Sequence, residues 1–550
     1  MTEDLNALFQ RANALFTAGR FEEALPIYEG LLESVPDVAD VHLNHATTLK
    51  ALGRLTEAEK GFHRAIGLNP GFAGAYFNLG NLLRERERYE EAEMYFRKAL
   101  EIDPENADFL NNLGATLMNL QKPEQALEVY SRASNLQQPT PEQDFRHAEA
   151  MEQAGLLDRA AERYQLVLDA RPVFPEAANN LGNALIKLGR YAEAEASFRT
   201  AIEHAPDRAE LYGNLATSLY EQGRYEEALQ LFDRSLGLNP DDAGVVMKRA
   251  MLLLLLGRWQ EGFEAYESRW HYKGHNRIRK PDFRCPLWDG GSLAGKTLLL
   301  HAEQGFGDAI QMARYASLLA TNGVDVIVRC QGGLARLFGS LKGVQTVIAE
   351  GNTLPDFDTH APMMSLPRLM GTTPETVPDE VPYLFVEETL RKKWQKRLKG
   401  RGRKIGLVWQ GNPAHERDHG RSLPVSCLEP LMALPNVSLF SLQIPARPDD
   451  LDRLGGRVED LGPDIEDFAD TAAAIESLDL VISVDTSVAH LAGALGRPVW
   501  IILPFAPDWR WGASGTSSPW YPHARIYRQV NPGKWSGIFS NIVEHIENMG

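Results

Sequence analysis

Three short segments of the chain combine glycine with charged and hydroxyl side chains in patterns that suit phosphorylated ligands. The first covers residues 301–308 and reads HAEQGFGD. Its glycines, Gly305 and Gly307, would let a ligand approach the backbone, and Asp308 could deprotonate an acceptor hydroxyl as a general base. Asp308 could also cap the helix that follows, and the two roles are compatible. The segment departs from the G-x-G-x-x-G fingerprint at Asp308, which disfavours a dehydrogenase.

The second segment, residues 411–422, reads GNPAHERDHGRS. Arg421 could bind a phosphate through its guanidinium fork and Ser422 through its hydroxyl, with Asn412 as a further polar contact. An ordinary surface loop would also be polar. Because so many donors follow one expected strand directly, the pattern favours a binding function.

The third segment, residues 483–494, reads SVDTSVAHLAGA. Small polar residues here end an expected strand and begin a helix, whose free N–H groups attract anions. The hydroxyls of Thr486 and Ser487 would add donors, and His490, one turn into the helix, could reach the same anion. Asp485 belongs to this predicted donor site as well, although helix capping alone would also explain it.

A turn at residues 507–511, PDWRW, could supply an aromatic face for a base or a sugar. We therefore include Trp509 among the expected donor-binding residues. A tryptophan buried in a protein core is an equally ordinary explanation.

The elements that must position these segments are short apolar runs alternating with amphipathic stretches, as in a doubly wound α/β sheet. Strands are expected at residues 297–300, 324–329 and 344–349, with a helix over 309–319. The pattern then restarts with strands at 404–409, 437–442, 480–484 and 499–503. This layout predicts two Rossmann-like lobes with a cleft between them.

Between the lobes lies a basic stretch, residues 391–404, in which nine of 14 residues are Lys or Arg. A solvated helix and hinge is the simpler interpretation. Contact with anionic lipid or with a substrate phosphate is the alternative.

The first half of the chain repeats with a period of 34 residues, the tetratricopeptide length. Small residues recur where two helices would cross closely, at Ala24, Ala58, Ala92, Ala126, Ala160, Ala194, Ala228 and Gly262. An aromatic residue follows each of them four positions later. Glycines end the first helix of most units, with Gln121 in that place in the weaker fourth unit. About eight repeats should therefore form an all-α superhelix.

Asparagine recurs at one repeat position and forms an expected ladder. Its members are Asn44, Asn78, Asn112, Asn180 and Asn214, with Arg146 and Lys248 in the remaining places. Side-chain amides can bind the backbone of an extended peptide whatever its sequence, so we expect these residues to hold an acceptor peptide. Alternatively, each asparagine bonds a neighbouring helix within the array.

Composition narrows the function classes. The formal charge of −17 disfavours a general nucleic-acid binder. Three dispersed cysteines in no CxxC pairing indicate neither a zinc site nor a disulfide framework and suit a reducing compartment. The acidic N-terminus does not resemble a signal peptide, and no apolar run approaches the length of a membrane span. We expect a cytoplasmic protein without an integral membrane segment.

Together these segments resemble glycosyltransferases of the GT-B fold, in particular the heptosyltransferase-like group. That resemblance implies a catalytic aspartate at Asp308 and phosphate binding by Asp485, Thr486 and His490. The asparagine ladder resembles that of the protein O-GlcNAc transferases, which implies a protein acceptor. Residues 303–308, 409–413 and 518–522 look closer still to bacterial proteins that fuse tetratricopeptide repeats to such a domain. Some of these are similar to flagellin glycosyltransferases, which use a CMP-activated nonulosonic acid.

The expected function is thus metal-independent transfer of a sugar from a nucleotide donor, CMP-nonulosonic acid or a UDP-sugar, to Ser or Thr of a protein such as flagellin. No metal or other cofactor is expected. The alternatives are an adaptor with a non-catalytic sugar-nucleotide domain and a transferase acting on lipopolysaccharide. The expected domains are repeats at 1–272, a connecting segment at 273–294, an acceptor-side lobe at 295–390, a linker at 391–403 and a nucleotide-side lobe with a C-terminal helix at 404–550.

Overall fold

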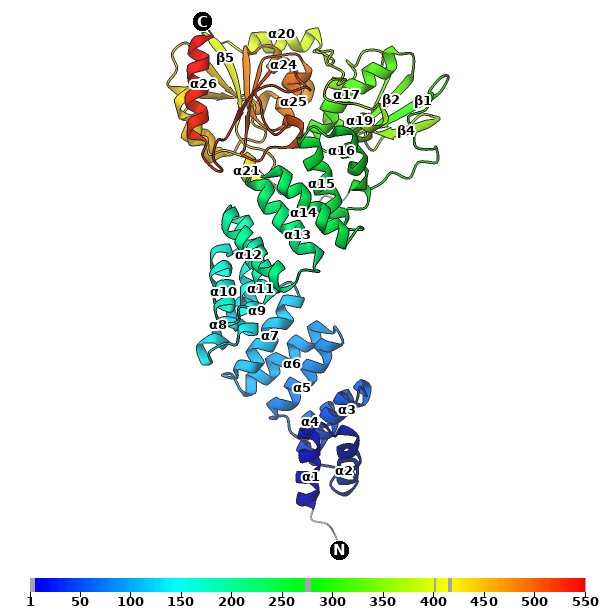
Figure 1. Cartoon of the computed structure of the whole chain (residues 1–550), viewed down its shortest axis with the longest axis vertical. Helices are drawn as coiled ribbons and strands as arrows, with labels where there is room; N and C mark the ends of the chain where they lie inside the picture. Colours follow the sequence, from blue (N-terminus) through cyan, green and yellow to red (C-terminus); the bar gives the residue numbers. More distant parts are fainter. Residues whose placement is uncertain (1–4, 273–277, 400–401, 414–417, 550) are drawn as a thin grey trace. The chain divides into compact units, whose positions relative to one another are not determined.

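The computed structural model describes residues 5–272, 278–399, 402–413 and 418–549. The chain divides into two compact units, Met1–Pro206 and Asp207–Gly550 (Figure 1). The division falls inside the repeat array, not at the boundary expected near residue 272. Residues 273–277 of the expected connecting segment, 400–401 of the expected linker and 414–417 of the second polar segment lie outside the described residues.

The first unit is built from antiparallel helix pairs of the tetratricopeptide type. The first helices of the pairs are α1 (Leu5–Thr17), α3 (Ala39–Ala51), α5 (Ala73–Glu85), α7 (Ala107–Asn119), α9 (Pro141–Gln153) and α11 (Pro175–Lys187). The second helices are α2 (Phe21–Ser34), α4 (Leu55–Leu68), α6 (Tyr89–Ile102), α8 (Pro123–Leu136), α10 (Leu157–Ala170) and α12 (Tyr191–His204). Below, they are called A helices and B helices.

The recurring small residues lie where the pairs cross, as the sequence predicts. Ala58 and Ala92, for example, are fully buried, and so are the aromatics that follow them, Phe62 and Phe96. Gly80 faces Phe96 so closely that a Cβ there would come within 2.8 Å of the ring. Close packing of helix against helix, repeated every 34 residues, therefore supplies a continuous core.

The turns between the helices of a pair require a left-handed residue, which explains the recurring glycines. Gly53 has φ +75° and Gly189 has φ +73°. Gln121, in the fourth repeat, adopts the same conformation, with φ 56°. Helices α8 and α9 have 14 and 13 residues, the same lengths as other B and A helices, so the fourth repeat retains the repeat geometry.

The second unit begins with two further helix pairs. These are α13 (Ala209–Glu221) with α14 (Tyr225–Leu238) and α15 (Ala243–Leu255) with α16 (Trp259–Tyr266), followed by the 3-10 turn η1 (Glu267–Trp270). Trp259 of α16 stacks on Trp520, with ring centroids 5.0 Å apart, and Tyr220 donates a hydrogen bond to the Pro507 carbonyl at 2.8 Å. These contacts make the last two repeats part of the same compact unit as the α/β region.

The first α/β lobe contains a parallel four-stranded sheet of order β3-β2-β1-β4. Its strands are β1 (Thr297–His301), β2 (Asp325–Cys330), β3 (Thr346–Ala349) and β4 (Thr359–Pro362). Its helices are α17 (Phe306–Thr321), α18 (Gly332–Phe338) and α19 (Leu366–Leu369), with the 3-10 turn η2 (Met363–Ser365). The sequence predicted three of these strands and missed β4, which is short and contains His360.

The second lobe contains a parallel six-stranded sheet of order β10-β9-β8-β5-β6-β7. Its strands are β5 (Arg403–Val408), β6 (Val437–Ser441), β7 (Val458–Asp460), β8 (Leu480–Val484), β9 (Val499–Leu503) and β10 (Ala524–Arg528). Its helical elements are α20 (Glu388–Arg397), α21 (Asp418–Arg421), η3 (Val425–Leu428), α22 (Glu429–Met432), α23 (Pro448–Leu454), η4 (Gly462–Asp464), α24 (Phe468–Glu476), α25 (Ser487–Ala494), η5 (Trp509–Trp511) and α26 (Ser536–Asn548). The strand order reverses between β5 and β8, which is where open α/β sheets bind ligands.

The basic stretch between the lobes forms helix α20, which packs on α24 of the second lobe. Trp394 at its centre is fully buried and donates a hydrogen bond to Asp470 at 2.8 Å. Arg391 and Lys393 form ion pairs with Glu476 and Asp470, both at 2.8 Å. The helix therefore packs one face on the second lobe and leaves Lys392 and Lys396 on its exposed face, while Arg391 and Lys393 are paired within the protein.

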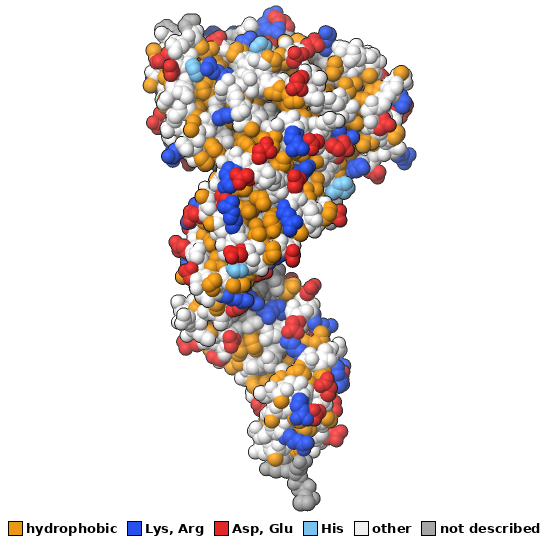
Figure 2. Space-filling view, viewed as in Figure 1, with side chains coloured by type: hydrophobic (Ala, Val, Ile, Leu, Met, Phe, Trp, Pro, Cys, Tyr) orange, Lys and Arg blue, Asp and Glu red, His pale blue; other side chains and the backbone are white. Residues whose placement is uncertain are grey.

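Among the described residues, no helix is long and apolar enough to cross a bilayer. On the face shown in Figure 2, acidic and basic side chains are interspersed, so neither charge dominates it.

Candidate functional site

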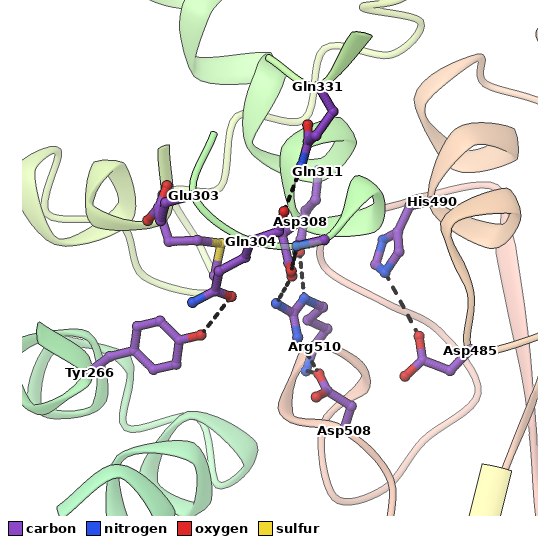
Figure 3. Close-up of polar contacts among 12 residues, drawn as sticks. Tyr266, Glu303, Gln304, Asp308, Gln311, Gln331, Asp485, His490, Asp508 and Arg510 are labelled. Carbon is purple, nitrogen blue, oxygen red and sulfur yellow. Dashed lines mark hydrogen bonds and ion pairs between the residues drawn. The ribbon is translucent and has the colours of Figure 1, made fainter. Parts of the chain in front are cut away.

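The first polar segment forms the turn between β1 and α17, and it positions Asp308 in the first turn of α17. The Oδ2 atom of Asp308 accepts a hydrogen bond from the Gly305 N–H at 3.0 Å. Asp308 Oδ1 forms an ion pair with Arg510 of the second lobe. The capping role expected for Asp308 is thus present, and its other oxygen faces the opposite lobe (Figure 3).

Arg510 joins the two lobes at this point. Its Nε donates to Gln311 Oε1 of α17 at 2.8 Å, and its Nη1 donates to Asp508 Oδ1 at 2.8 Å. Only 9% of Arg510 is exposed. Burial alone would lower the pKa of the guanidinium, but the nearby carboxylates of Asp508 and Asp308 raise it above its ordinary value. Arg510 is therefore a permanently charged group between these carboxylates.

Gly307 allows the two lobes to meet. A Cβ at this position would lie 2.9 Å from His490 Cδ2 and 3.6 Å from Ser487 Cα of helix α25. The sequence predicted that the glycines would admit a ligand to the backbone. The structure instead uses Gly307 for close approach of α17 to α25, and Gly305 as the exposed residue whose N–H is bound by Asp308.

His490 and Asp485 lie beside this contact on the second lobe. His490 Nδ1 lies 2.9 Å from the Tyr521 hydroxyl, and its Nε2 lies 3.8 Å from Asp485 Oδ1. Burial and the charge of Arg510 lower the pKa of His490 to about 3, so its ring is neutral and the contact with Asp485 is not an ion pair. Burial, with repulsion from Asp508, raises the pKa of Asp485 to about 6.

The start of helix α25, where the sequence predicts an anion site, has no side-chain cap. Thr486 is the N-cap residue, and its side chain makes no capping hydrogen bond; its Oγ1 lies 3.0 Å from Ser483 Oγ. Ser487 opens the helix and is partly exposed. Asp485 does not cap the helix, so capping does not account for it. A helix start without a side-chain cap can donate its first N–H groups to an anion.

The described part of the second polar segment folds around Asp418. Arg421 Nε lies 3.1 Å from Asp418 Oδ1, and Arg421 Nη1 donates to the Asp485 carbonyl at 3.3 Å. The Ser422 hydroxyl donates to Asp418 at 3.0 Å and accepts from the Gly411 N–H at 2.9 Å. Arg421 is thus placed next to the α25 start, whereas the proton of Ser422 is already used within the loop.

Asn412 is exposed at the beginning of that loop. Trp509, by contrast, is 2% exposed and packs edge-on against Phe263, with centroids 5.5 Å apart. Arg510 Cζ also lies 4.4 Å from the centroid of the Trp509 ring. The expectation that Trp509 offers a face to a base or sugar is therefore corrected: it belongs to the core that attaches the last repeats to the α/β region.

The asparagines of the expected ladder occupy the sixth position of their A helices and are partly exposed. Asn44 Nδ2 donates to Asn13 at 2.9 Å and Asn78 Nδ2 lies 3.5 Å from Thr47 Oγ1, both on the preceding A helix. Asn112 bonds the Asp108 carbonyl of its own helix at 2.8 Å. Asn180 lies 3.4 Å from the Tyr164 hydroxyl.

Bonding to neighbouring helices, the simpler alternative, therefore occurs for part of the set. Each of these contacts uses one amide hydrogen, and an amide has two donors and two acceptor lone pairs. Asn214 occupies the equivalent place on α13, in the second unit.

Sequence reasoning assigned no role to Arg510, Gln311 or Glu303, although two of them lie in segments it had selected. Arg510 is part of the 507–511 turn, and Glu303 is part of the 301–308 segment. Gln311 follows Asp308 by three positions on α17, so helical periodicity places both on one face. That spacing could have identified Gln311; the partner of Arg510 could not be found without the fold.

Glu303 is a buried acid next to this site, and its side chain is 4% exposed. Its Oε1 accepts from Arg269 at 3.1 Å and from the Met364 N–H at 3.2 Å, while Oε2 has no hydrogen-bond partner among the described residues. Burial raises the pKa of Glu303 to about 7, although Arg269 opposes the shift. The Glu303 carboxyl is therefore protonated below about pH 7 and ionised above it.

We expect Glu303→Gln to change how the stability of the second unit depends on pH. The folded chain keeps the Glu303 proton up to about pH 7, whereas an ordinary glutamate has a pKa of 4.5. Folded protein thus binds more protons between these values, and its free energy of unfolding falls as pH rises through this window. Relative to the wild type, the variant should gain about 3 kcal/mol across the window.

Urea unfolding at several pH values would measure this, with tryptophan fluorescence as the signal, because all ten tryptophans lie beyond residue 206. Glu350→Gln, on a side chain that is 64% exposed, is the matched control and should follow the wild type. If the pH profiles of Glu303→Gln and the wild type ran parallel, the raised pKa of Glu303 would be excluded.

Comparison with known proteins identifies the repeat region. Tetratricopeptide repeat models match residues 15–79, 73–106, 95–128, 174–240 and 214–270. These matches agree with the helix pairs described above.

Protein FlbA of Caulobacter vibrioides is 27% identical to the chain over 312 residues, an alignment that covers 51% of each protein. The chain thus spans about half the length of this curated relative. Among solved structures, YrrB, described as a TPR protein with an unusual peptide-binding site, is 24% identical over 40% of this chain and 97% of its own, with a TM-score of 0.27. PilF of Pseudomonas aeruginosa is 21% identical over 37% and 92%, with a TM-score of 0.34. Both likenesses concern the repeat fold alone.

Proposed function

We propose that the chain is a glycosyltransferase that moves a sugar from a nucleotide donor to a serine or threonine hydroxyl of a protein. The observation that carries the proposal is the close approach of the start of helix α17, where Gly307 and Asp308 lie, to Ser487 and His490 of helix α25 in the other lobe. Asp308 follows β1, and Thr486 and His490 follow β8, so groups suited to a hydroxyl acceptor and to phosphate stand at the carboxyl ends of facing sheets.

In the proposed reaction the acceptor oxygen attacks the anomeric carbon while the bond from that carbon to the donor phosphate breaks. Asp308 takes the proton of the acceptor hydroxyl. The departing nucleotide carries the negative charge, which the N–H groups of α25, Arg421 and Arg510 stabilise. No metal ion is needed for this arrangement of charges.

The ion pair between Asp308 and Arg510 implies that, in the proposed reaction, the donor binds before Asp308 acts as the base. While Arg510 pairs with Oδ1 and the Gly305 N–H donates to Oδ2, each oxygen of Asp308 already has one partner that the acceptor hydroxyl must compete with. A donor phosphate competes with Asp308 for Arg510, because both are anions that pair with guanidinium. Binding of the donor phosphate to Arg510 would thus release Asp308 to act as the base.

The tetratricopeptide repeats support protein binding, since such arrays commonly hold a partner chain along their A helices. The acceptor proposed from the sequence resemblance is a protein such as flagellin, and the donor is a CMP-nonulosonic acid or a UDP-sugar. An adaptor role is the second candidate, and the specific observation in its favour is that both oxygens of Asp308 are already engaged.

A thermal-shift screen of the full chain with UDP-, GDP-, ADP- and CMP-linked sugars and the free nucleotides tests the proposal. A ligand that binds only the folded state adds about 2.7 kcal/mol of stability at 100 times its Kd. We expect one nucleotide class to raise the Tm, and Thr486→Val to reduce that rise. Thr321→Val, an exposed residue at the end of α17, is the control and should respond like the wild type. A well-folded sample that responds to none of these ligands would favour the adaptor.

A further inference from the structure

The first unit contains a polar cavity of about 350 Å³ that the proposed transfer reaction does not use. Its lining comes from A helices α5, α7 and α9 together with one residue of α8. The principal lining residues are Arg84, Met118, Tyr130, Arg146 and Glu149. A cavity of this size falls in the range that accommodates organic groups, and it exceeds the needs of a single ion.

Two guanidinium groups in this cavity have no partner of their own. Among the described residues, neither Arg84 nor Arg146 forms an ion pair or a side-chain hydrogen bond. Burial lowers the pKa of Arg84, and the charge of Arg146 lowers it further. Most other arginines of this unit form ion pairs, as Arg88 does with Glu91 at 2.7 Å. Two like charges facing one space without a carboxylate partner attract an anion.

The acidic residues of the cavity do not supply that anion. Glu85 is engaged by Lys50 in an ion pair of 2.6 Å. Glu149 lies three positions after Arg146 on α9 without forming an ion pair with it. Burial raises the pKa of Glu149, with Arg146 opposing the shift. The unpaired groups are thus two guanidiniums and one carboxyl, which leaves a net positive cavity.

The Tyr130 hydroxyl is a further hydrogen-bond donor of the cavity, and it has no acceptor among the described residues. The residue is 2% exposed, and its hydroxyl has no partner among the described residues. Its ring is held in place by Gly114, where a Cβ would lie 2.6 Å from the ring. A buried hydroxyl without a partner is costly, and a ligand that accepts a hydrogen bond from it removes that cost.

Arg146 also occupies the repeat position that carries asparagine in α5 and α7, at Asn78 and Asn112. The cavity therefore adjoins the row of amides that suits an extended backbone. We propose that it binds an aspartate or glutamate side chain of a polypeptide lying along the A helices. This proposal does not depend on glycosyl transfer, because an adaptor would use the same cavity.

An oriented peptide library presented to the immobilised full chain tests it. The peptides are randomised around one fixed central residue, which is Glu, Gln, Ala or phosphoserine, and the retained peptides are quantified by mass spectrometry. The wild type should retain the Glu library over the Gln library. In the double variant Arg84→Gln with Arg146→Gln, that preference should fall about ten-fold or more.

Arg159→Gln, an exposed arginine on the B helix α10, is the matched control and should keep the preference. Tyr130→Phe keeps the ring on Gly114 and loses only the hydroxyl, so it should weaken the Glu preference with no loss of thermal stability. Circular dichroism and the Tm would verify that every variant is folded. Equal retention of the Glu and Gln libraries, a preference that survives in the double variant, or stronger retention of phosphoserine than of Glu would each overturn the proposal.

Discussion

Asp308→Asn is expected to lower glycosyl transfer by about 10²- to 10⁴-fold, the usual contribution of a positioned general base. Asparagine keeps an oxygen that can accept from the Gly305 N–H, and Arg510 keeps its contacts with Asp508 and Gln311, so the fold should survive. The substitution removes the capacity to take a proton and also the negative charge that pairs with Arg510. The donor should still raise the Tm of the variant.

The measurement is intact-mass analysis of an acceptor protein, flagellin in the first instance, after incubation with the nucleotide sugar that stabilises the chain. Asp379→Asn replaces an exposed aspartate of the same lobe and serves as the control. Undiminished transfer by a folded Asp308→Asn variant would show that the base is another group. The buried Glu303 would then be the next residue to replace.

Arg510→Met is expected to destabilise the second unit by about 3 kcal/mol, the low end of the cost of removing one partner of a buried ion pair, because the Asp308 and Asp508 side chains are only partly buried. Asp308 and Asp508 both lose their ion pair with Arg510, and Gln311 Oε1 loses the Arg510 donor. The methionine side chain preserves most of the volume, so packing contributes little to the loss. This effect is distinct from any loss of donor binding.

Urea unfolding followed by tryptophan fluorescence would measure the loss in the second unit. Asp508→Asn in the Arg510→Met background removes one of the negative charges that Arg510 offsets and should recover part of the stability, since the two residues are in direct contact. Arg453→Met, on an exposed arginine, is the control and should change the free energy of unfolding by no more than about 0.5 kcal/mol. Equal stability of Arg510→Met and the wild type would mean that the charges around it are not buried from water.

The helices and strands of both halves could be predicted because the residue patterns that indicate them involve positions close together in the chain. The helix pairs follow from small and aromatic residues at a fixed period, and Ala58 and Phe62 are buried together as that period requires. The strands at 297–301 and 480–484 follow from uninterrupted apolar runs, which sheets covered on both faces require. Strand β4 carries no such run, and it was missed.

The candidate site could be predicted only in part. Asp308, Thr486 and His490 were selected because each stands next to the end of a strand, where parallel sheets bind ligands. The role of Trp509 was wrong, because its sequence neighbours do not reveal that Phe263 of the last repeats covers it. Gly307 was likewise predicted to contact a ligand, although a Cβ at this position would lie nearest to His490.

The sequence by itself determined the repeat architecture, the two parallel sheets and the polar segments at their strand ends, because helical and strand periodicities depend on residues a few positions apart. Only the tertiary structure decided which of those segments meet. Arg510 and Asp308 are 202 positions apart, and the Arg84 and Arg146 of the cavity lie on separate A helices. Contacts of this kind depend on how whole elements pack, and no local pattern in the chain encodes them.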